Sequence, residues 1–528
     1  MASSRKPDDG NDGGRSIRAD RLTSSARLLA YKSTLRAGPP GALGRRGASA
    51  AARLPADSYA AHGYLTELRR LWRLALPLAA AHAGSEIMRL VDTAVVGRIG
   101  AVPLGALGLG NALFFSVTVL AMGIMLGFDP LIAQALGAAG SARARRLWWQ
   151  AVWAALLLGA AASVLVAAII PAIEPLGLDP ELAAATRPVL AVRIAGIVPF
   201  LLFVATRSYL QAVGRTAPLV TAMVVGNLVN LAAVFPLVFG GSVLPAWAGA
   251  LRGLPALGAA GAAAATSIAF VAQLAVVLLA LRAVPCPELA RGSRRPARRE
   301  LGQAWRVGLP VGLQIGAEVG IFALVAFLAG RLGPLPLAAH QVALTLASFT
   351  FMVVLGVSSA GSVRVGRAIG AADPAGTRRA GLVAMGSGAA FMALSATALL
   401  LFPRDLARLL TDQPAVVAAA VPLVAVAAVF QLSDGLQAVA SGALRGAGDT
   451  RFALVANLAG HYAVGLPLAV GLSFGLGLGV VGLWWGLWAG LTTVAALLLV
   501  RFVRLSSRPI APIEAPGRAN ADPRPAPC

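Results

Sequence analysis

Three carboxylates lie inside long apolar segments of the chain. Asp92 falls in segment 72–97, Glu318 in segment 305–330, and Asp434 in segment 415–443. Placing a charged side chain at the centre of a membrane costs on the order of 2.5–3.5 kcal/mol on insertion scales, so such residues are default candidates for function. A carboxylate there can exchange a proton or hold Na⁺ or an organic cation. We therefore predict that Asp92, Glu318 and Asp434 couple cation binding to function.

Polar neighbours share a helical face with the two later acids. Gln314 precedes Glu318 by four residues, Gln437 follows Asp434 by three, and Ser433 adjoins Asp434. Side chains at this spacing meet on one face of a helix. We predict that Gln314, Ser433 and Gln437 line an aqueous substrate pathway, where desolvation favours the protonated form of a carboxyl group. The alternative is that the acids only form hydrogen bonds or ion pairs between helices.

The first acid has a charged environment of its own. Arg89 precedes Asp92 by three residues, and Glu86 precedes Arg89 by three. One interpretation places Glu86 on the substrate pathway and Asp92 in cation coupling. The other is a Glu86–Arg89–Asp92 charge network that fixes the helix. Asn227 and Asn230, in a later segment, either line the same pathway or bond between helices.

The elements that must position these residues are membrane helices. Of the 528 residues, 58% are hydrophobic and 13% are charged, and the mean hydropathy is +0.76. Soluble proteins carry about 25% charge, and a bilayer-spanning helix needs about 20 apolar residues. The sequence predicts an all-α polytopic protein whose twelve spans are 72–97, 104–136, 147–171, 187–212, 217–240, 257–282, 305–330, 337–369, 380–402, 415–443, 452–474 and 479–503.

The chain repeats itself. Gly97-Arg98-Ile99-Gly100 returns as Gly330-Arg331-Leu332-Gly333, and the same shift of 233 residues maps Pro77 onto Pro310 and Gly137 onto Gly370. Duplicated hydrophobic halves are the usual build of secondary transporters, with the site between the repeats. We predict an N-lobe at 67–282 and a C-lobe at 305–503, joined by a cytoplasmic loop at 283–304 and flanked by disordered segments at 1–66 and 504–528.

Charge sets the expected orientation. The formal net charge is +23, and arginines concentrate in the loops that follow even-numbered spans. This pattern follows the positive-inside rule, which predicts an inner (cell) membrane protein with both termini in the cytoplasm. It also argues against nucleic-acid binding as the source of the basic charge.

No motif of a common enzyme class is present. The two cysteines have no partner at metal-binding spacing, and the chain lacks a phosphate-binding Gly-Lys-Ser/Thr loop. We expect neither enzymatic activity nor a cofactor, so the coupling ion is H⁺ or Na⁺, with Na⁺ held by Glu318 and Asp434. The expected partners are small-molecule substrates and membrane lipids, and we expect a monomer.

Several short motifs resemble one transporter family. They are Leu90-Val91-Asp92-Thr93, Gly316-Ala317-Glu318-Val319, Ala338 to Ala343, Val363 to Arg367, Ser433-Asp434-Gly435 and Gly442 to Thr450. Together they resemble the multidrug and toxic compound extrusion (MATE) family, closest to its NorM-like branch, over about residues 68–503. The resemblance implies two six-helix lobes forming a V. It also implies multidrug efflux by alternating access, driven by inward H⁺ or Na⁺.

The resemblance assigns roles to the acids. Asp92 matches the family's helix 1 acid, and Glu318 and Asp434 match its C-lobe cation site. Arg89 departs from the common pattern, and we expect it to neutralise Asp92. The predicted function is a cation-coupled antiporter that exports organic, amphipathic cations. The alternatives are a flippase for lipid-linked precursors, which would need a basic central cavity, and a membrane enzyme or scaffold whose acids are paired off.

Overall fold

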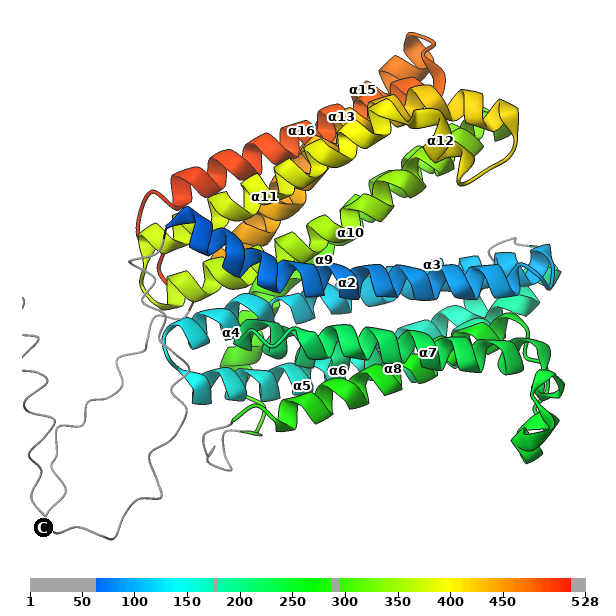
Figure 1. Ribbon diagram of the computed structural model, residues 1–528, viewed down its shortest axis with the longest axis horizontal. Helices are drawn as coiled ribbons and strands as arrows, with labels where there is room; N and C mark the ends of the chain where they lie inside the picture. The colour runs from blue at the N-terminus through cyan, green and yellow to red at the C-terminus, as the bar shows by residue number, and fades with distance from the viewer. Residues whose placement is uncertain (1–62, 174–178, 286–293, 514–528) are drawn as a thin grey trace, which may run out of the picture. The chain divides into compact units, whose positions relative to one another are not determined.

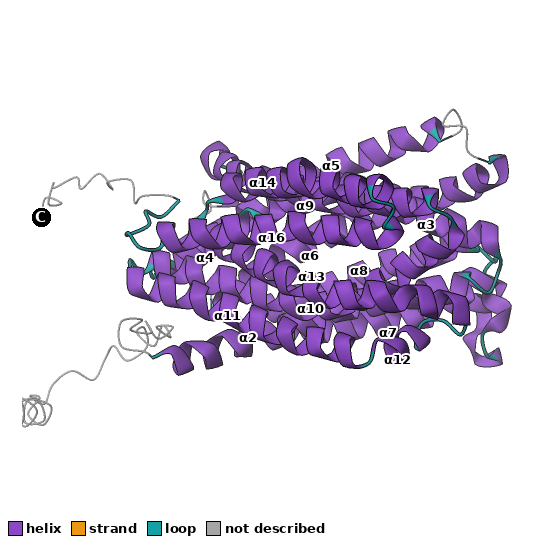
Figure 2. Ribbon diagram, turned by 90° about the horizontal axis from the view of Figure 1, so that it is seen from above, coloured by secondary structure: helices purple, strands orange, loops and turns teal. Residues whose placement is uncertain are grey.

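The computed structural model describes residues 63–173, 179–285 and 294–513. Within these ranges every regular element is a helix and no strand occurs (Figure 2). This confirms the predicted all-α class. Most of the predicted N-terminal extension (1–62) and the end of the C-terminal tail (514–528) lie outside the described residues.

The first half contains the helices labelled α2 to α8 in Figure 1. Two short 3-10 helices, Gly241–Val243 and Ala246–Gly253, connect α7 to α8, and the predicted span 104–136 is divided into α3 and α4 at Gly127. The helices are α2 Tyr64–Val96, α3 Ala101–Leu126, α4 Phe128–Gly137, α5 Ser141–Ala172, α6 Pro180–Val213, α7 Ala217–Phe239 and α8 Ala259–Arg282.

The second half contains α9 to α16. A stretch of π-helix, Ala459–Gly465, joins α14 to α15, and a second stretch, Gly471–Gly475, follows α15. Together they form one continuous helical segment that matches the predicted span 452–474. The helices are α9 Arg298–Arg331, α10 Pro334–Gly370, α11 Pro374–Leu401, α12 Pro403–Arg408, α13 Pro414–Ala447, α14 Thr450–Leu458, α15 Leu466–Val470 and α16 Gly479–Leu505.

Each of the twelve predicted spans coincides with a helix or a continuous helical segment. Among the described residues, eleven of these are long and apolar enough to cross a membrane. Helix α2 is also long, with 33 residues, but Glu86, Arg89 and Asp92 make it more polar. The arrangement of the twelve segments as a V stays a prediction.

The duplication is visible in the backbone. Ala139 and Ala372, related by the shift of 233 residues, are the two non-glycine residues with positive φ in the described chain, at 56° and 54°. Gly214 and Gly448 end α6 and α13 in the same left-handed conformation, with φ of 87° and 84°. Because L-residues other than glycine seldom adopt this conformation, its recurrence at matching alanines supports a common origin of the halves.

The hydrophobic core joins the two halves at one end only. One cluster combines first-half residues with the segments of α10, α11, α13 and α16 that lie nearest the arginine-rich loops. Two further clusters lie toward the other end, one within the second half and one within the first. Along the shared cluster, α2 packs on α10, α3 on α9 and α4 on α10 (Figure 1).

The chain after α16 returns to the first half. Helix α16 continues to Leu505, beyond the predicted start of the tail at 504. Ile510 and Ile513 then pack against the shared core. The backbone N–H of Ile513 donates to Oε1 of Gln134 in α4 at 2.9 Å. The described part of the tail is therefore held against both halves.

Candidate functional site: two carboxylate centres

The second half brings two of the predicted acids together. Glu318 projects from α9 and Asp434 from α13, and the two carboxyl groups are close enough to interact electrostatically. Asp434 is 7% exposed. Gln437, one turn further along α13, donates from Nε2 to Oε2 of Glu318 at 3.3 Å. The structure thus places Glu318, Asp434 and Gln437 in one centre between α9 and α13.

Two other predicted pathway residues hold helices together. Nε2 of Gln314 on α9 donates to Oγ of Ser441 on α13 at 3.0 Å. The hydroxyls of Ser433 on α13 and Thr492 on α16 lie 2.7 Å apart. Interhelical hydrogen bonds of this kind are common between transmembrane helices. These contacts fix the positions of α9, α13 and α16 around the acids.

Asn457 of α14 belongs to the same centre, and the sequence did not single it out. Its side chain is fully buried and faces Glu318, yet neither its amide nitrogen nor its oxygen has a partner at hydrogen-bonding geometry. Burying an unsatisfied polar group costs about 1–3 kcal/mol, so such groups normally meet water or a ligand. The available signal was an asparagine within an apolar span.

A π-helical turn lies directly after Asn457. It covers Ala459–Gly465, and its Tyr462 donates from the hydroxyl to the carbonyl of Ala317 at 2.8 Å. π-helical turns are rare and occur often at functional sites. Through this hydrogen bond the π-helical turn, which continues α14, is anchored to α9 beside Glu318.

The chemistry of this centre is that of an oxygen-rich cation site. It offers two carboxylates and the amide oxygen of Asn457, and hard cations prefer oxygen ligands. Among the described residues no group of three or more His, Cys, Asp or Glu side chains could hold a metal ion.

The first half holds Asp92 in a different environment. Asp92 is 3% exposed and accepts hydrogen bonds from Nδ2 of Asn230 on α7 at 3.0 Å and Oγ1 of Thr266 on α8 at 2.5 Å. Asn230 thus binds an acid between helices. Asn227 donates to the backbone carbonyls of Gly84 at 3.0 Å and Met223 at 2.9 Å, which ties α7 to α2.

The alternative interpretation from the sequence, a Glu86–Arg89–Asp92 charge network, is wrong, and so is the expectation that Arg89 neutralises Asp92. Arg89 pairs with Glu86 alone, at 2.6 Å, with side chains 63% and 36% exposed. Six residues of α-helix rotate the side chain by about 600°, so Glu86 and Asp92 point in directions about 120° apart. Asp92 turns toward α7 and α8, while Arg89 stays on the exposed face of α2.

Arg193 of α6 is the cation that faces Asp92. It is 7% exposed, donates to Oδ1 of Asn111, and lies over the ring of Phe114 at 5.2 Å from the centroid. An arginine within the apolar span 187–212 was a signal of the same kind as the acids, but among charged residues the sequence interpretation considered only the acids and Arg89. Arg193, rather than Arg89, supplies the positive charge near Asp92.

Each half of the chain separately matches the sequence model of one known family. The sequence model of the MatE family matches residues 77–235 and again residues 310–470. The chain belongs to the MatE family. Each match falls within one half of this MatE chain and includes the acids described above, Asp92 in the first and Glu318 and Asp434 in the second.

Curated relatives extend this result over most of the chain. A probable multidrug resistance protein NorM of Deinococcus radiodurans is 38% identical over 446 residues, covering 83% of this chain and 95% of the relative. The corresponding protein of Rhizobium meliloti is 34% identical over 457 residues, covering 84% and 94%. The predicted family resemblance is confirmed.

A solved structure shows the same fold. It is an outward-facing multidrug resistance MATE transporter of the MOP superfamily, with a TM-score of 0.75, 21% identity, and coverage of 84% of this chain and 96% of the other. The MatE chain described here is therefore a multi-pass helical membrane protein of the same fold.

Proposed function

We propose that this MatE protein is a secondary antiporter that exports organic, amphipathic cations in exchange for H⁺ or Na⁺. The observation that carries the proposal is the centre formed by half-buried Glu318, buried Asp434 and the buried amide of Asn457, which faces Glu318. The relatives above are named as multidrug resistance proteins, and duplicated halves are typical of secondary transporters.

Competition for the acids provides the coupling. When Glu318 and Asp434 are deprotonated, the centre attracts a cationic substrate; when a proton or Na⁺ occupies it, that attraction is lost. A ligand shifts a conformational equilibrium only through its different affinity for the two states. Neutralising two adjacent carboxylates in a low-dielectric centre is a large difference of this kind, so the ion and the substrate stabilise opposite states.

The position of the shared core supports an assignment of the side of the membrane to which the described conformation is closed. The halves are joined at the end that carries the arginine-rich loops, and each has its own core at the other end. The positive-inside rule places the basic end in the cytoplasm together with both termini. The described conformation is then closed toward the cytoplasm of an inner-membrane protein, the state in which exported substrate leaves and coupling ions enter.

Asp92 has a subordinate part in this mechanism. Asn230 and Thr266 already occupy its carboxylate, and Arg193 balances its charge. A satisfied and balanced acid gains little from binding a further cation, so we assign coupling mainly to the second half. The flippase alternative would require a basic site, and the centre at Glu318 and Asp434 is acidic.

Transport in proteoliposomes tests the proposal. Uptake of a fluorescent organic cation into vesicles is measured under an imposed pH gradient or an imposed Na⁺ gradient, for the native protein and for Glu318→Gln and Asp434→Asn. We expect one gradient to drive transport by the native protein. Both variants should fall to the level of protein-free vesicles.

The matched control is Asp412→Asn, which neutralises an exposed acid before α13. It should transport as the native protein does. Gradient-driven transport that survives intact in both Glu318→Gln and Asp434→Asn would refute the mechanism.

A further inference from the structure

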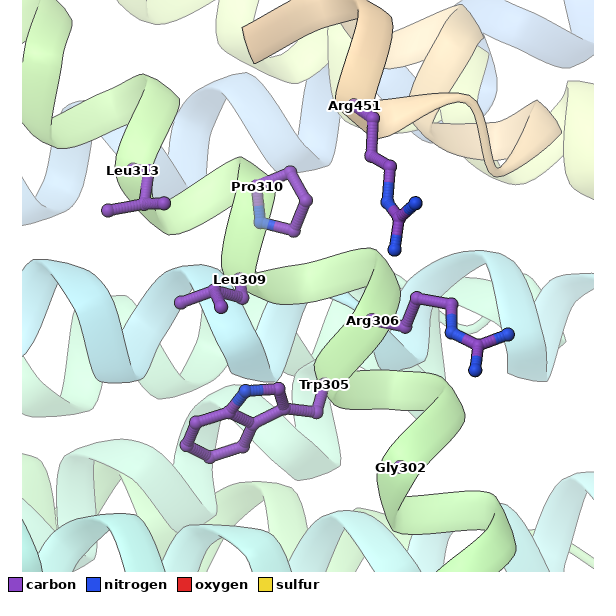
Figure 3. Close-up of a pocket in the computed structure, with 7 residues that line it drawn as sticks. All are labelled: Gly302, Trp305, Arg306, Leu309, Pro310, Leu313 and Arg451. Carbon is purple, nitrogen blue, oxygen red and sulfur yellow. The ribbon is translucent and has the colours of Figure 1, made fainter.

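A groove lies between the first half of α9 and the first turn of α14, apart from both carboxylate centres. It is lined by Gly302, Trp305, Arg306, Leu309, Pro310 and Leu313 of α9 and by Arg451 of α14, and its volume is about 370 Å³ (Figure 3). Ligand pockets in proteins usually measure about 300–1,000 Å³. The groove is thus large enough for a small polar group, but too small to enclose a large substrate.

Two arginines from different helices line this groove. Arg306 and Arg451 are both exposed, and Figure 3 shows their guanidinium groups on the same side of α9. Within the described ranges, neither arginine forms a hydrogen bond or an ion pair. Two carboxylates at the same end of the protein already have partners, since Asp449 accepts from Arg501 at 2.6 Å and Glu300 pairs with Arg146. The positive charge of the groove is therefore not compensated by any side chain in the described ranges.

The rest of the groove is apolar. Trp305 is 48% exposed and Leu313 is 47% exposed, although both are large hydrophobic side chains. From Gly302 to Leu313, α9 rises by about 16 Å, so the groove runs from the basic, loop-bearing end toward the apolar middle of the helix. Tryptophan is enriched at the level of lipid headgroups. Charge at one end and exposed leucine at the other match the shape of an amphiphile.

We propose that this groove binds one anionic phospholipid of the cytoplasmic leaflet. Its phosphate lies between Arg306 and Arg451, its glycerol region contacts Trp305, and one acyl chain follows Leu309 and Leu313. Guanidinium groups bind phosphate through charge-assisted hydrogen bonds, and basic pockets between transmembrane helices bind anionic headgroups. The assignment to the cytoplasmic leaflet rests on the orientation under the proposed function.

The lipid would join two helices that carry parts of the second-half centre. Thr450 already fixes α14 to α9, donating from Oγ1 to the carbonyl of Val307 at 2.7 Å. Glu318 lies further along α9 and Asn457 further along α14. A phosphate held by one arginine from each helix adds a second link at the same crossing, which stabilises the helix pair and with it the centre.

Thermal unfolding of the purified full-length protein tests the site. Delipidated protein in detergent is supplemented with phosphatidylglycerol or with phosphatidylcholine at equal mole fraction. We expect phosphatidylglycerol to raise Tm by several degrees more than phosphatidylcholine. Arg306→Gln combined with Arg451→Gln should lose more than half of that difference, and Arg306→Lys with Arg451→Lys should keep most of it.

The control removes two exposed arginines elsewhere. Arg404→Gln with Arg408→Gln, on α12, should keep the full difference. An equal loss in this control, or no loss in the Arg306/Arg451 variant, overturns the proposal. A Tm rise of the same size with millimolar inorganic phosphate alone would show a free-anion site and overturn the assignment to a lipid.

A second measurement leaves both arginines intact. Tryptophan fluorescence is quenched with brominated phosphatidylglycerol or brominated phosphatidylcholine in the native protein, in Trp305→Phe, and in Trp247→Phe as the control. We expect phosphatidylglycerol to quench a component that disappears only in Trp305→Phe. Equal quenching of that component by both lipids would contradict selective binding, even if the arginine variants failed to fold.

Discussion

Gly137 and Gly370 occupy equivalent positions in the two halves, and each lies against the backbone of the other half. A Cβ atom on Gly137 would lie 2.1 Å from the carbonyl oxygen of Arg367, and one on Gly370 would lie 2.0 Å from that of Gln134. Gln134 and Arg367 are themselves related by the shift of 233 residues. The contact is therefore reciprocal, as at a two-fold axis.

Substituting either glycine should weaken this contact. Gly137→Ala and Gly370→Ala each force α4 and α10 apart, and overpacking of this kind costs about 1–3 kcal/mol. Thermal unfolding in detergent measures the effect as a lower Tm. Gly108→Ala on α3, where nothing lies within 4 Å of the added Cβ, should leave Tm unchanged or raise it, because alanine favours helix. A Tm at or above the native value for both Gly137→Ala and Gly370→Ala would contradict the close approach.

The Glu67–Arg364 pair should contribute strongly to the contact between α2 and α10. Arg364 on α10 donates from Nε to Oε1 of Glu67 on α2 at 2.8 Å and from Nη2 to Oε2 at 2.6 Å, with both side chains at most 4% exposed. Breaking a buried pair costs about 3–5 kcal/mol, since one charge is left uncompensated. We expect Glu67→Gln and Arg364→Gln each to lower Tm markedly.

Coupling between the two substitutions distinguishes a pair from two separate effects. The double variant should be less destabilised than the sum of the single variants. The control is Asp449→Asn, which breaks the Arg501–Asp449 pair within the second half. Because the Arg501 side chain is 43% exposed, this variant should shift Tm only slightly. Simple additivity of the two single effects would argue against a direct pair.

The hydroxyl of Thr266 should stabilise Asp92. Thr266→Val keeps the shape of the side chain but removes a hydrogen bond to a buried carboxylate, a bond of a type that contributes about 1.5–3 kcal/mol. The matched control is Thr221→Val on α7, whose exposed hydroxyl bonds only the carbonyl of Ala217, one turn earlier. Chemical unfolding of both variants measures the difference. Equal stability of the two would show that Asp92 does not depend on Thr266.

Arg193 and Arg89 should differ sharply in their importance. Arg193→Gln leaves buried Asp92 without its facing cation, and it also removes the contacts to Asn111 and Phe114. We expect a large drop in Tm and in folded yield. Arg89→Gln breaks an exposed pair with Glu86, and such pairs contribute about 0–1 kcal/mol. A larger effect for Arg89→Gln would restore the charge network predicted from the sequence.

Most of the fold could be predicted because apolar segment length determines which segments cross a membrane. The twelve spans end within four residues of the observed helices and begin within eight. The bounds moved mostly at the polar ends, as at α9, which begins at Arg298 rather than 305. The short helix Pro403–Arg408 and the π-helical turn at Ala459 were not predicted. Such local departures depend on tertiary neighbours, which hydropathy does not contain.

The sites were predictable only where a charge stood out. Glu318 and Asp434 are costly in a membrane and were found, whereas Asn457 is neutral and gives a weaker signal. The predicted partner of Asp92, Arg89, was wrong because helical spacing indicates only which residues of the same helix lie close together. Its actual donors, Asn230 and Thr266, lie 138 and 174 residues away in sequence.

Ala139 and Ala372 show what duplication has preserved. Each is the last residue of a Gly-Ala-Ala tripeptide, and each turn is closed by three equivalent backbone hydrogen bonds of 2.9–3.1 Å. Glycine would normally occupy the left-handed position of such a helix ending, and alanine there costs on the order of 1 kcal/mol. The two turns thus share their backbone conformation and their hydrogen bonds, and the protein carries the same small conformational penalty once in each half.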